Sequence, residues 1–204
     1  MAQLAAIASE WPRTAADHEV VYIGQAFGRE KERTAWDRLK RHETVQRILA
    51  ETTPDKQVWL TLAAITDTNL SMDVSPESAE VSDEEDLAHG NLIMATFEQG
   101  TFKKRHAVAL AEAGLIRMFE PHYNTRLKSK FPAGTLASLE SVRPLDLSGV
   151  VIELQGWDIG MRYGSSVRKM NQLHFAGFMI HQDQGRSAPI TLQPNDDLVV
   201  YREK

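Results

Sequence analysis

The chain has 204 residues, of which 42% are hydrophobic and 25% are charged, and these values exclude general disorder and a fibrous repeat. No apolar run approaches the roughly 20 residues that a membrane-spanning helix needs, and the first residues lack the basic start and apolar core of an export signal. The chain has no cysteine, which excludes disulfides and thiolate metal sites and fits a cytoplasmic protein, while its net charge of −5 argues at first against a nucleic-acid partner.

The first part of the chain predicts strands that alternate with helices. Residues 20–24 read VVYIG and predict a strand that ends on a glycine. Residues 34–51 have the apolar spacing of an amphipathic helix, and residues 58–65, VWLTLAAI, predict a short buried strand. A second helix is predicted over residues 96–119, and Pro121 ends it because the residue before a proline is pushed out of helical geometry.

The negative charge is concentrated in residues 72–86, which read MDVSPESAEVSDEED and contain no basic residue. We expect this stretch to be a mobile loop, since it has little apolar surface to bury. Residues 29–47 and 103–130 are rich in Arg and Lys, and without the acidic stretch the chain is weakly positive. The distribution of charge therefore allows a nucleic-acid partner although the net charge does not suggest one.

After Pro144 the sequence consists of short apolar runs separated by glycines, which predicts a β-rich part. We divide the chain into a core over residues 1–132 and a β-rich C-terminal extension over residues 145–204. The extension is expected either to form a small sheet that closes the core or to provide a homodimer surface. Its aromatic and Arg residues offer another reading, a surface that reads sequence or stacks on RNA bases, carried by Trp157, Arg162 and Tyr163.

Three segments carry residues that suit phosphodiester chemistry: VYIG on the first strand, RLKRH on the first helix and EAGLIRMFEPHYN at the end of the second helix. In this order they resemble the GIY-YIG nuclease superfamily. Tyr22, Ile23 and Gly24 match its second signature strand, and Arg38 and His42 match a helix found in restriction-type members. The family's later helix and the loop after it are matched by Glu112, Leu115, Ile116, Pro121 and Asn124.

The resemblance implies an α+β fold with a small antiparallel or mixed sheet flanked by helices. It also implies a metal-dependent endonuclease that hydrolyses DNA, with RNA as a possible substrate, in a restriction or phage-defence setting. Hydrolysis needs an activated water, neutralised phosphoryl oxygens and a stabilised leaving oxygen. One carboxylate can hold Mg²⁺ or Mn²⁺ because Mg²⁺ keeps several waters.

Each candidate catalytic residue has an expected role. Glu112 binds the metal, and the Arg38 guanidinium contacts the phosphate through two hydrogen bonds. Tyr22 positions or deprotonates the water, and His42 shuttles a proton or binds phosphate. Asn124 orients a partner or caps the loop after the helix.

Basic residues outside this catalytic set are expected to contact the nucleic-acid backbone. Arg33 is also a rival to Arg38, because it lies closer to Tyr22 in the sequence, but Arg38 fits the RL..H context better. The expected contacts are Arg33, Arg41, Lys103, Lys104, Arg126 and Lys128.

The family's first signature strand, with its own tyrosine, has no counterpart between Met1 and Glu19. Three explanations are open: a degenerate strand over residues 4–7, residues outside this chain, or another segment that completes the sheet. Loss of one phenol from an acid–base pair lowers a rate by roughly 10²- to 10⁴-fold. The alternatives to an endonuclease are therefore a catalytically reduced module that binds nucleic acid, and an interaction protein without catalysis.

Overall fold

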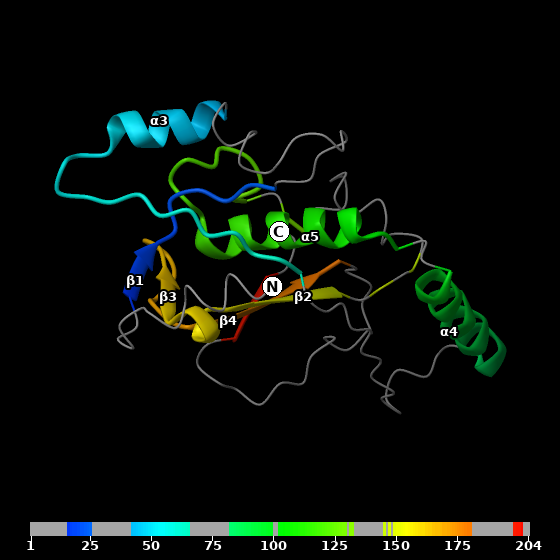
Figure 1. Ribbon diagram of the computed structural model, residues 1–204. Coiled ribbons are helices and arrows are strands. Elements are labelled where there is room, and N and C mark those ends of the chain that lie inside the picture. The colour runs from blue at the N-terminus through cyan, green and yellow to red at the C-terminus, as the bar shows by residue number, and fades with distance from the viewer. Residues whose placement is uncertain are drawn as a thin grey trace.

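The structure is a computed structural model that describes residues 16–25, 42–65, 82–99, 102–129, 131–132, 145, 147, 149–180 and 198–201. These ranges contain helices and two small sheets (Figure 1). The predicted α+β class is confirmed at this level. No described helix combines the length and the apolar character that crossing a bilayer requires.

The two sheets differ in size and pairing. In the smaller sheet, β1 (Ala16–Glu19) runs parallel to β3 (Met161–Gly164). In the larger sheet, β4 (Leu173–Met179) lies in the middle, antiparallel to β2 (Gly149–Gln155) and parallel to β5 (Leu198–Tyr201). The sheets are therefore of the parallel and mixed kind.

Helix α5 (Lys104–Phe119) packs across β2 and β4 and forms the core with them. The contact is close at Gly114, where an added Cβ would collide with Ile152 of β2 and Phe178 of β4. A glycine in the middle of a helix is unfavourable for the helix alone, so this one indicates a requirement for close packing. The residue after the helix, Glu120, caps it with a left-handed backbone and a φ of 44°.

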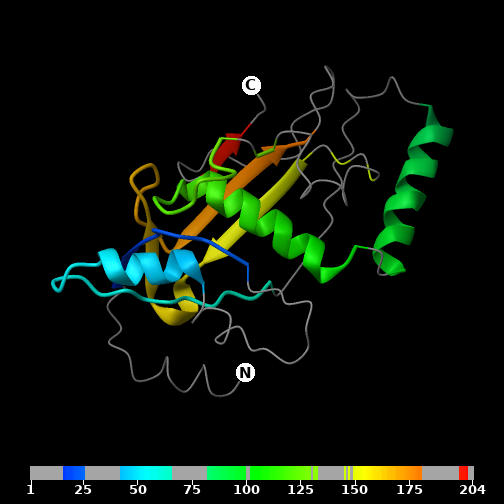
Figure 2. The same cartoon turned by 90° about the horizontal axis from the view of Figure 1, so that it is seen from above.

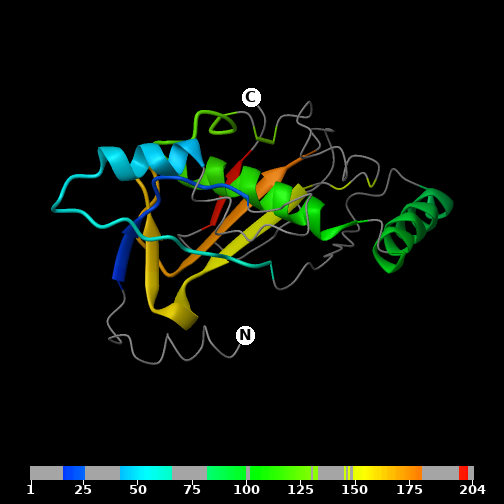
Figure 3. The same cartoon turned by 45° about the horizontal axis from the view of Figure 1, so that its top comes forward.

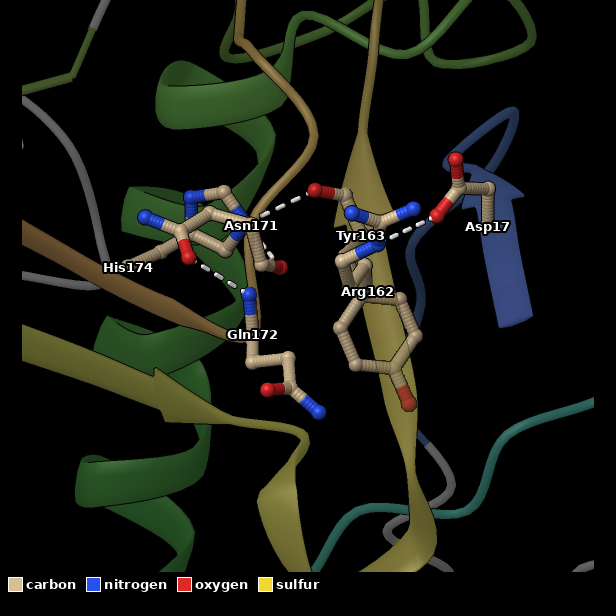
Figure 4. Close-up of polar contacts among 6 residues, drawn as sticks. All are labelled: Asp17, Arg162, Tyr163, Asn171, Gln172 and His174. Atoms are coloured by element: carbon tan, nitrogen blue, oxygen red, sulfur yellow. Dashed lines mark hydrogen bonds and ion pairs between the residues drawn. The ribbon is translucent and has the colours of Figure 1, made fainter. Parts of the chain in front are cut away.

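A hairpin-like connection joins the two sheets and is held by a buried histidine (Figure 4). The Nε2 atom of His174 lies 2.8 Å from the carbonyl oxygen of Tyr163 and 3.1 Å from that of Asn171. Next to it, the Arg162 Nε atom donates to Asp17 Oδ1 over 2.5 Å, which links β3 to β1. The histidine therefore has a structural task, because its ring satisfies buried carbonyl groups.

Two predicted strands differ from the structure. The first strand lies at β1 and ends at Glu19, whereas residues 20–25 are extended but outside the sheet. Residues 58–65 form no strand and are largely exposed, with Trp59 at 52% and Leu62 at 66%. Pairing with β3 decides where the first strand lies, and neither pairing nor burial can be read from an apolar run alone.

The acidic stretch is also different from the expected loop, since its last residues begin helix α4 (Asp83–Glu98). Ser82 and Glu85 form a capping pair: the Ser82 hydroxyl lies 2.9 Å from Glu85 Oε2 and 3.3 Å from the Glu85 backbone nitrogen. Acidic side chains are favourable in a first helical turn because they face the positive end of the helix dipole. Residues 72–81 of the stretch lie outside the described ranges.

The helix predicted over residues 96–119 is divided between two helices. Helix α4 ends at Glu98 and α5 begins at Lys104, and α4 lies apart from α5 and the sheets (Figure 3). The end at Phe119 agrees with the prediction. Of the helix predicted over residues 34–51, the described part is α3 (Glu43–Glu51).

The predicted division into residues 1–132 and 145–204 stays a prediction. The core contains residues from both parts, since Leu110 and Phe119 of α5 share one cluster with Ile152 and Phe178 of the larger sheet. The C-terminal strands therefore supply the surface on which α5 rests.

Candidate functional site

Tyr22 lies on the extended segment that follows β1, and the loop after α5 holds this segment on both sides of the tyrosine. The Asn124 side chain accepts from the Ile23 nitrogen over 2.9 Å and donates to the Ile23 oxygen over 2.8 Å. The Tyr123 nitrogen donates to the Val21 oxygen over 2.9 Å. Asn124 therefore replaces a neighbouring strand, which explains why a buried amide is needed at this position.

The Tyr22 phenol reaches the beginning of α3. Its oxygen lies 3.2 Å from His42 Nε2, and the two ring centroids are 5.4 Å apart. His42 is the residue that precedes the first turn of α3, and Thr44 in that turn also hydrogen-bonds to the phenol. Gly24 leaves room for this arrangement, because a Cβ there would lie 2.8 Å from the Tyr22 oxygen. The glycine of the YIG motif thus has a local steric role.

The second nitrogen of His42 is shielded from solvent. Within the described ranges, Nδ1 has no hydrogen-bond partner. If the Tyr22 phenol donates its proton to Nε2, the neutral imidazole carries its own proton on Nδ1. A buried donor of this kind is costly unless an acceptor satisfies it.

Helix α5, which carries Glu112, runs beside the segment that contains Tyr22 (Figure 2). Its Oε1 accepts from the Gln25 nitrogen over 3.1 Å. Burial raises the pKa of Glu112, and the Gln25 hydrogen bond offsets part of this effect. Burial also raises the pKa of Tyr22, and the charge of Glu112 raises it further. The phenol and the carboxylate therefore share one electrostatic environment.

The described residues fit a metal only through Glu112. No group of three or more His, Asp or Glu side chains in these ranges could hold an ion. In the described part of the chain, no cation pairs with Glu112. A half-buried carboxylate without a cation partner suits Mg²⁺ or Mn²⁺, which complete their coordination with waters and phosphate oxygens. We therefore regard the metal role of Glu112 as chemically consistent.

The other predicted residues are distributed unevenly. Arg33, Arg38 and Arg41 lie outside the described ranges. Lys103 and Lys104 are exposed at the beginning of α5, while Arg126 and Lys128 follow its other end. A helix with the 16 residues of α5 is about 24 Å long, so these two pairs do not form one compact patch.

Sequence reasoning missed several residues of the site. Gln25 directly follows the YIG motif, and Thr44 follows His42 by two positions. Tyr123, directly before Asn124, donates its phenol proton to Glu51 Oε2 over 2.7 Å, and this hydrogen bond raises the pKa of Tyr123. Proximity to the motifs was the available signal, but the contacts depend on how distant segments meet.

Tyr22, His42, Glu112 and Asn124 thus come from four separate segments and meet around one extended stretch. The resemblance to the GIY-YIG superfamily stays a prediction. Neither a protein-family model, nor a curated protein, nor a solved structure matches the chain significantly.

Proposed function

We propose that the protein is a metal-dependent endonuclease of the GIY-YIG type that hydrolyses phosphodiester bonds in DNA, in a restriction or phage-defence setting. One observation carries the proposal: the Tyr22 phenol contacts His42, and Glu112 accepts a hydrogen bond from Gln25 on the same segment, three residues after Tyr22. A phenol, an imidazole and a half-buried carboxylate are the groups that can accept, pass and compensate charge during hydrolysis.

Tyr22 is a neutral phenol in the resting site, because its pKa is raised by burial and by Glu112. It therefore needs a proton acceptor before it can take a proton from water. His42 provides one, since Nε2 lies within hydrogen-bond distance of the phenol. The water proton passes to the Tyr22 oxygen as the phenol proton passes to His42. The hydroxide attacks phosphorus, and the bond between phosphorus and the leaving oxygen breaks.

Glu112 is the residue that would hold the metal. When bound there, a divalent ion would supply Lewis acidity at the phosphoryl oxygens and would stabilise the leaving oxygen. The Gln25 hydrogen bond fixes one carboxylate oxygen and leaves the other for a ligand. Asn124 has no direct chemical part in this scheme, because both ends of its amide are engaged with Ile23. It holds Tyr22 in position.

Arg38 is proposed to contact the scissile phosphate, and Arg33 and Arg41 the flanking backbone. Lys103, Lys104, Arg126 and Lys128 extend this contact along α5 and the loop after it. One pair, Lys103 and Lys104, lies at the beginning of α5, and the other, Arg126 and Lys128, follows its end. This separation fits an extended duplex better than a small anionic ligand.

A catalytically reduced module that binds nucleic acid is the second candidate, and the smaller sheet favours it. In the described part of the chain no second phenol joins Tyr22: the Tyr163 hydroxyl lies 3.4 Å from Met161 sulfur instead. The strand beside β1 is parallel to it, whereas a strand joined by a short turn would be antiparallel. Of the three explanations for the missing strand, a substitute from elsewhere in the chain agrees with this pairing.

Plasmid cleavage separates the candidates. Supercoiled plasmid is incubated with Mg²⁺ or Mn²⁺ and the wild-type protein, Glu112→Gln or Arg38→Ala, and DNA binding is measured in parallel. An endonuclease cuts, loses at least about 10²-fold in rate with either substitution, and keeps its DNA affinity in Glu112→Gln. Glu98→Gln, an exposed acidic residue on α4, is the matched control and should cut like the wild type.

Cleavage that survives both substitutions would reject the proposed site. Salt-sensitive binding without cleavage would favour the binding module. If the protein shows neither cleavage nor salt-sensitive binding, the interaction protein is the remaining candidate.

A further inference from the structure

We propose that Tyr123 is a positioning residue that sets α3 against the Tyr22 segment and so controls the contact between Tyr22 and His42. For its effect on cleavage this inference rests on the proposed function, but its structural part stands independently. Tyr123 links two elements at once: its backbone nitrogen donates to the Val21 oxygen over 2.9 Å, and its phenol donates to Glu51 over 2.7 Å.

These contacts close a ring of interactions. Tyr22 contacts His42 at the beginning of α3, and α3 ends at Glu51. Glu51 accepts from the Tyr123 phenol, and the Tyr123 backbone returns to Val21, the neighbour of Tyr22. A shift of either end of α3 therefore strains the other end, because the helix between them is stiff.

The charged side chains at the end of α3 do not stabilise the helix by themselves. Glu51 lies in the last turn, where a negative charge faces the negative end of the helix dipole, and no basic residue occupies that turn. Arg47 precedes Glu51 by four positions, which is the weaker orientation for an ion pair on a helix. The Arg47 Nε atom lies 3.8 Å from Glu51 Oε1. Both side chains instead meet Tyr123, since the Arg47 guanidinium lies 5.0 Å from its ring centroid.

Helix α3 is thinly packed compared with α5. Ile48 is its one buried residue, and Leu49 is 51% exposed. By contrast, six residues of α5 are buried. A thinly packed helix depends more strongly on a single polar link than a helix that is held by a core. The Tyr123 link is therefore placed where it has the greatest effect on the site.

Three single variants test the link, together with the double variant that combines Tyr123→Phe with Glu51→Ala. Tyr123→Phe keeps the ring beside Arg47 but removes the hydrogen bond, and Glu51→Ala removes the acceptor. Glu51→Gln keeps an amide oxygen that can accept from the phenol, so it is the conservative control. For each variant, hydrogen exchange of the α3 amides, the NMR resonances of the His42 ring and single-turnover plasmid cleavage are measured, together with DNA affinity.

Tyr123→Phe and Glu51→Ala should raise amide exchange in α3 and lower the cleavage rate by about three- to tenfold, the size expected for one lost hydrogen bond. Both should move the His42 resonances in the same way, while DNA affinity stays unchanged. The double variant should resemble either single one, and Glu51→Gln should resemble the wild type. A residue that only stabilises the surface would not move the His42 resonances.

Wild-type exchange and wild-type His42 resonances in Tyr123→Phe would overturn the inference. So would a change in Glu51→Ala that Tyr123→Phe does not share. If the wild type does not cleave DNA, the proposed function fails, but exchange and the His42 resonances still decide whether Tyr123 positions α3.

Discussion

Helices α5 and α3 supply the two sides of the candidate site and are anchored very differently. Helix α5 carries Glu112 and is packed on the larger sheet, so closely that Gly114 has no room for a side chain. Helix α3 begins next to His42 and has one buried residue, Ile48. The carboxylate is thus held by the core, whereas the imidazole is held by polar contacts at the two ends of a short helix.

This difference separates stability from function. Changes on the face of α5 that packs on the larger sheet should act on folding, because they disturb the core. Changes of α3 and of the Tyr22 side chain should act on cleavage, with smaller effects on unfolding. The expected effects below test that separation.

The largest effect is expected for Tyr22→Phe. The ring still packs beside His42, but the hydroxyl that exchanges the proton is lost, so cleavage should fall by roughly 10²- to 10⁴-fold. The unfolding temperature should change little. Tyr163→Phe is the matched control, since its hydroxyl contacts Met161 away from the site. Equal losses in the two variants would contradict the special role of Tyr22.

Asn124→Ala should affect both folding and cleavage. It leaves the backbone nitrogen and oxygen of Ile23 without their partners. Each such group costs about 1–3 kcal/mol when it is shielded from water. Denaturant unfolding and cleavage would be compared with Asn124→Asp, which can accept from the nitrogen but cannot donate to the oxygen. If both variants are as stable as the wild type, the hydrogen bonds between Asn124 and Ile23 are dispensable for folding.

Gly114→Ala should destabilise the protein although alanine is the better helix former. The new Cβ collides with Ile152 and Phe178, and overpacking of this kind costs about 1–3 kcal/mol. Gly90→Ala on α4 is the matched control, because nothing lies within 4 Å of a Cβ there. It should stabilise the protein by about 0.5–1 kcal/mol. The same sign for both substitutions would contradict the packing of α5.

The smallest effect concerns pH. Burial raises the pKa of Glu112, so the folded protein binds this proton more tightly than the unfolded chain. The contribution of Glu112 to the free energy of unfolding is therefore present below the ordinary carboxyl pKa. It is lost as the pH rises through the raised pKa of the folded protein. Glu112→Gln should therefore gain stability relative to the wild type at neutral pH and lose that gain in acid.

Glu85 is the opposite case and serves as the control for the pH measurement. Its hydrogen bonds with Ser82 lower its pKa, so its contribution is present above the ordinary carboxyl pKa and is lost as pH falls. The difference in melting temperature between variant and wild type should change with pH in opposite directions for Glu112→Gln and Glu85→Gln. Parallel slopes would contradict the assigned environments.

The sequence predicted local features better than contacts between distant segments. Pro121 marked the end of α5, and the spacing around Ile48 marked α3. Ser82 and Glu85 have the spacing of a capping pair, which predicts the start of a helix, whereas the acidic composition around them predicts a loop. The order of the residues therefore indicates the start of α4 better than their composition does.

The remaining differences have a physical cause. The apolar run at residues 58–65 predicted a buried strand, but burial depends on a partner surface that no local pattern contains. The parallel pairing of β1 with β3 joins residues from opposite parts of the chain. The resemblance identified Tyr22, His42, Glu112 and Asn124 as candidates, whereas the contact of Tyr123 with Glu51 depends on the tertiary fold.

The most direct test of a shared site is a double-mutant cycle of cleavage rates with Tyr22→Phe and Glu112→Gln. Groups that act in one step are strongly non-additive, so the double variant should be about as slow as the slower single variant. Losses that multiply, each variant being folded, would mean that Tyr22 and Glu112 act independently, and this would contradict a common catalytic centre.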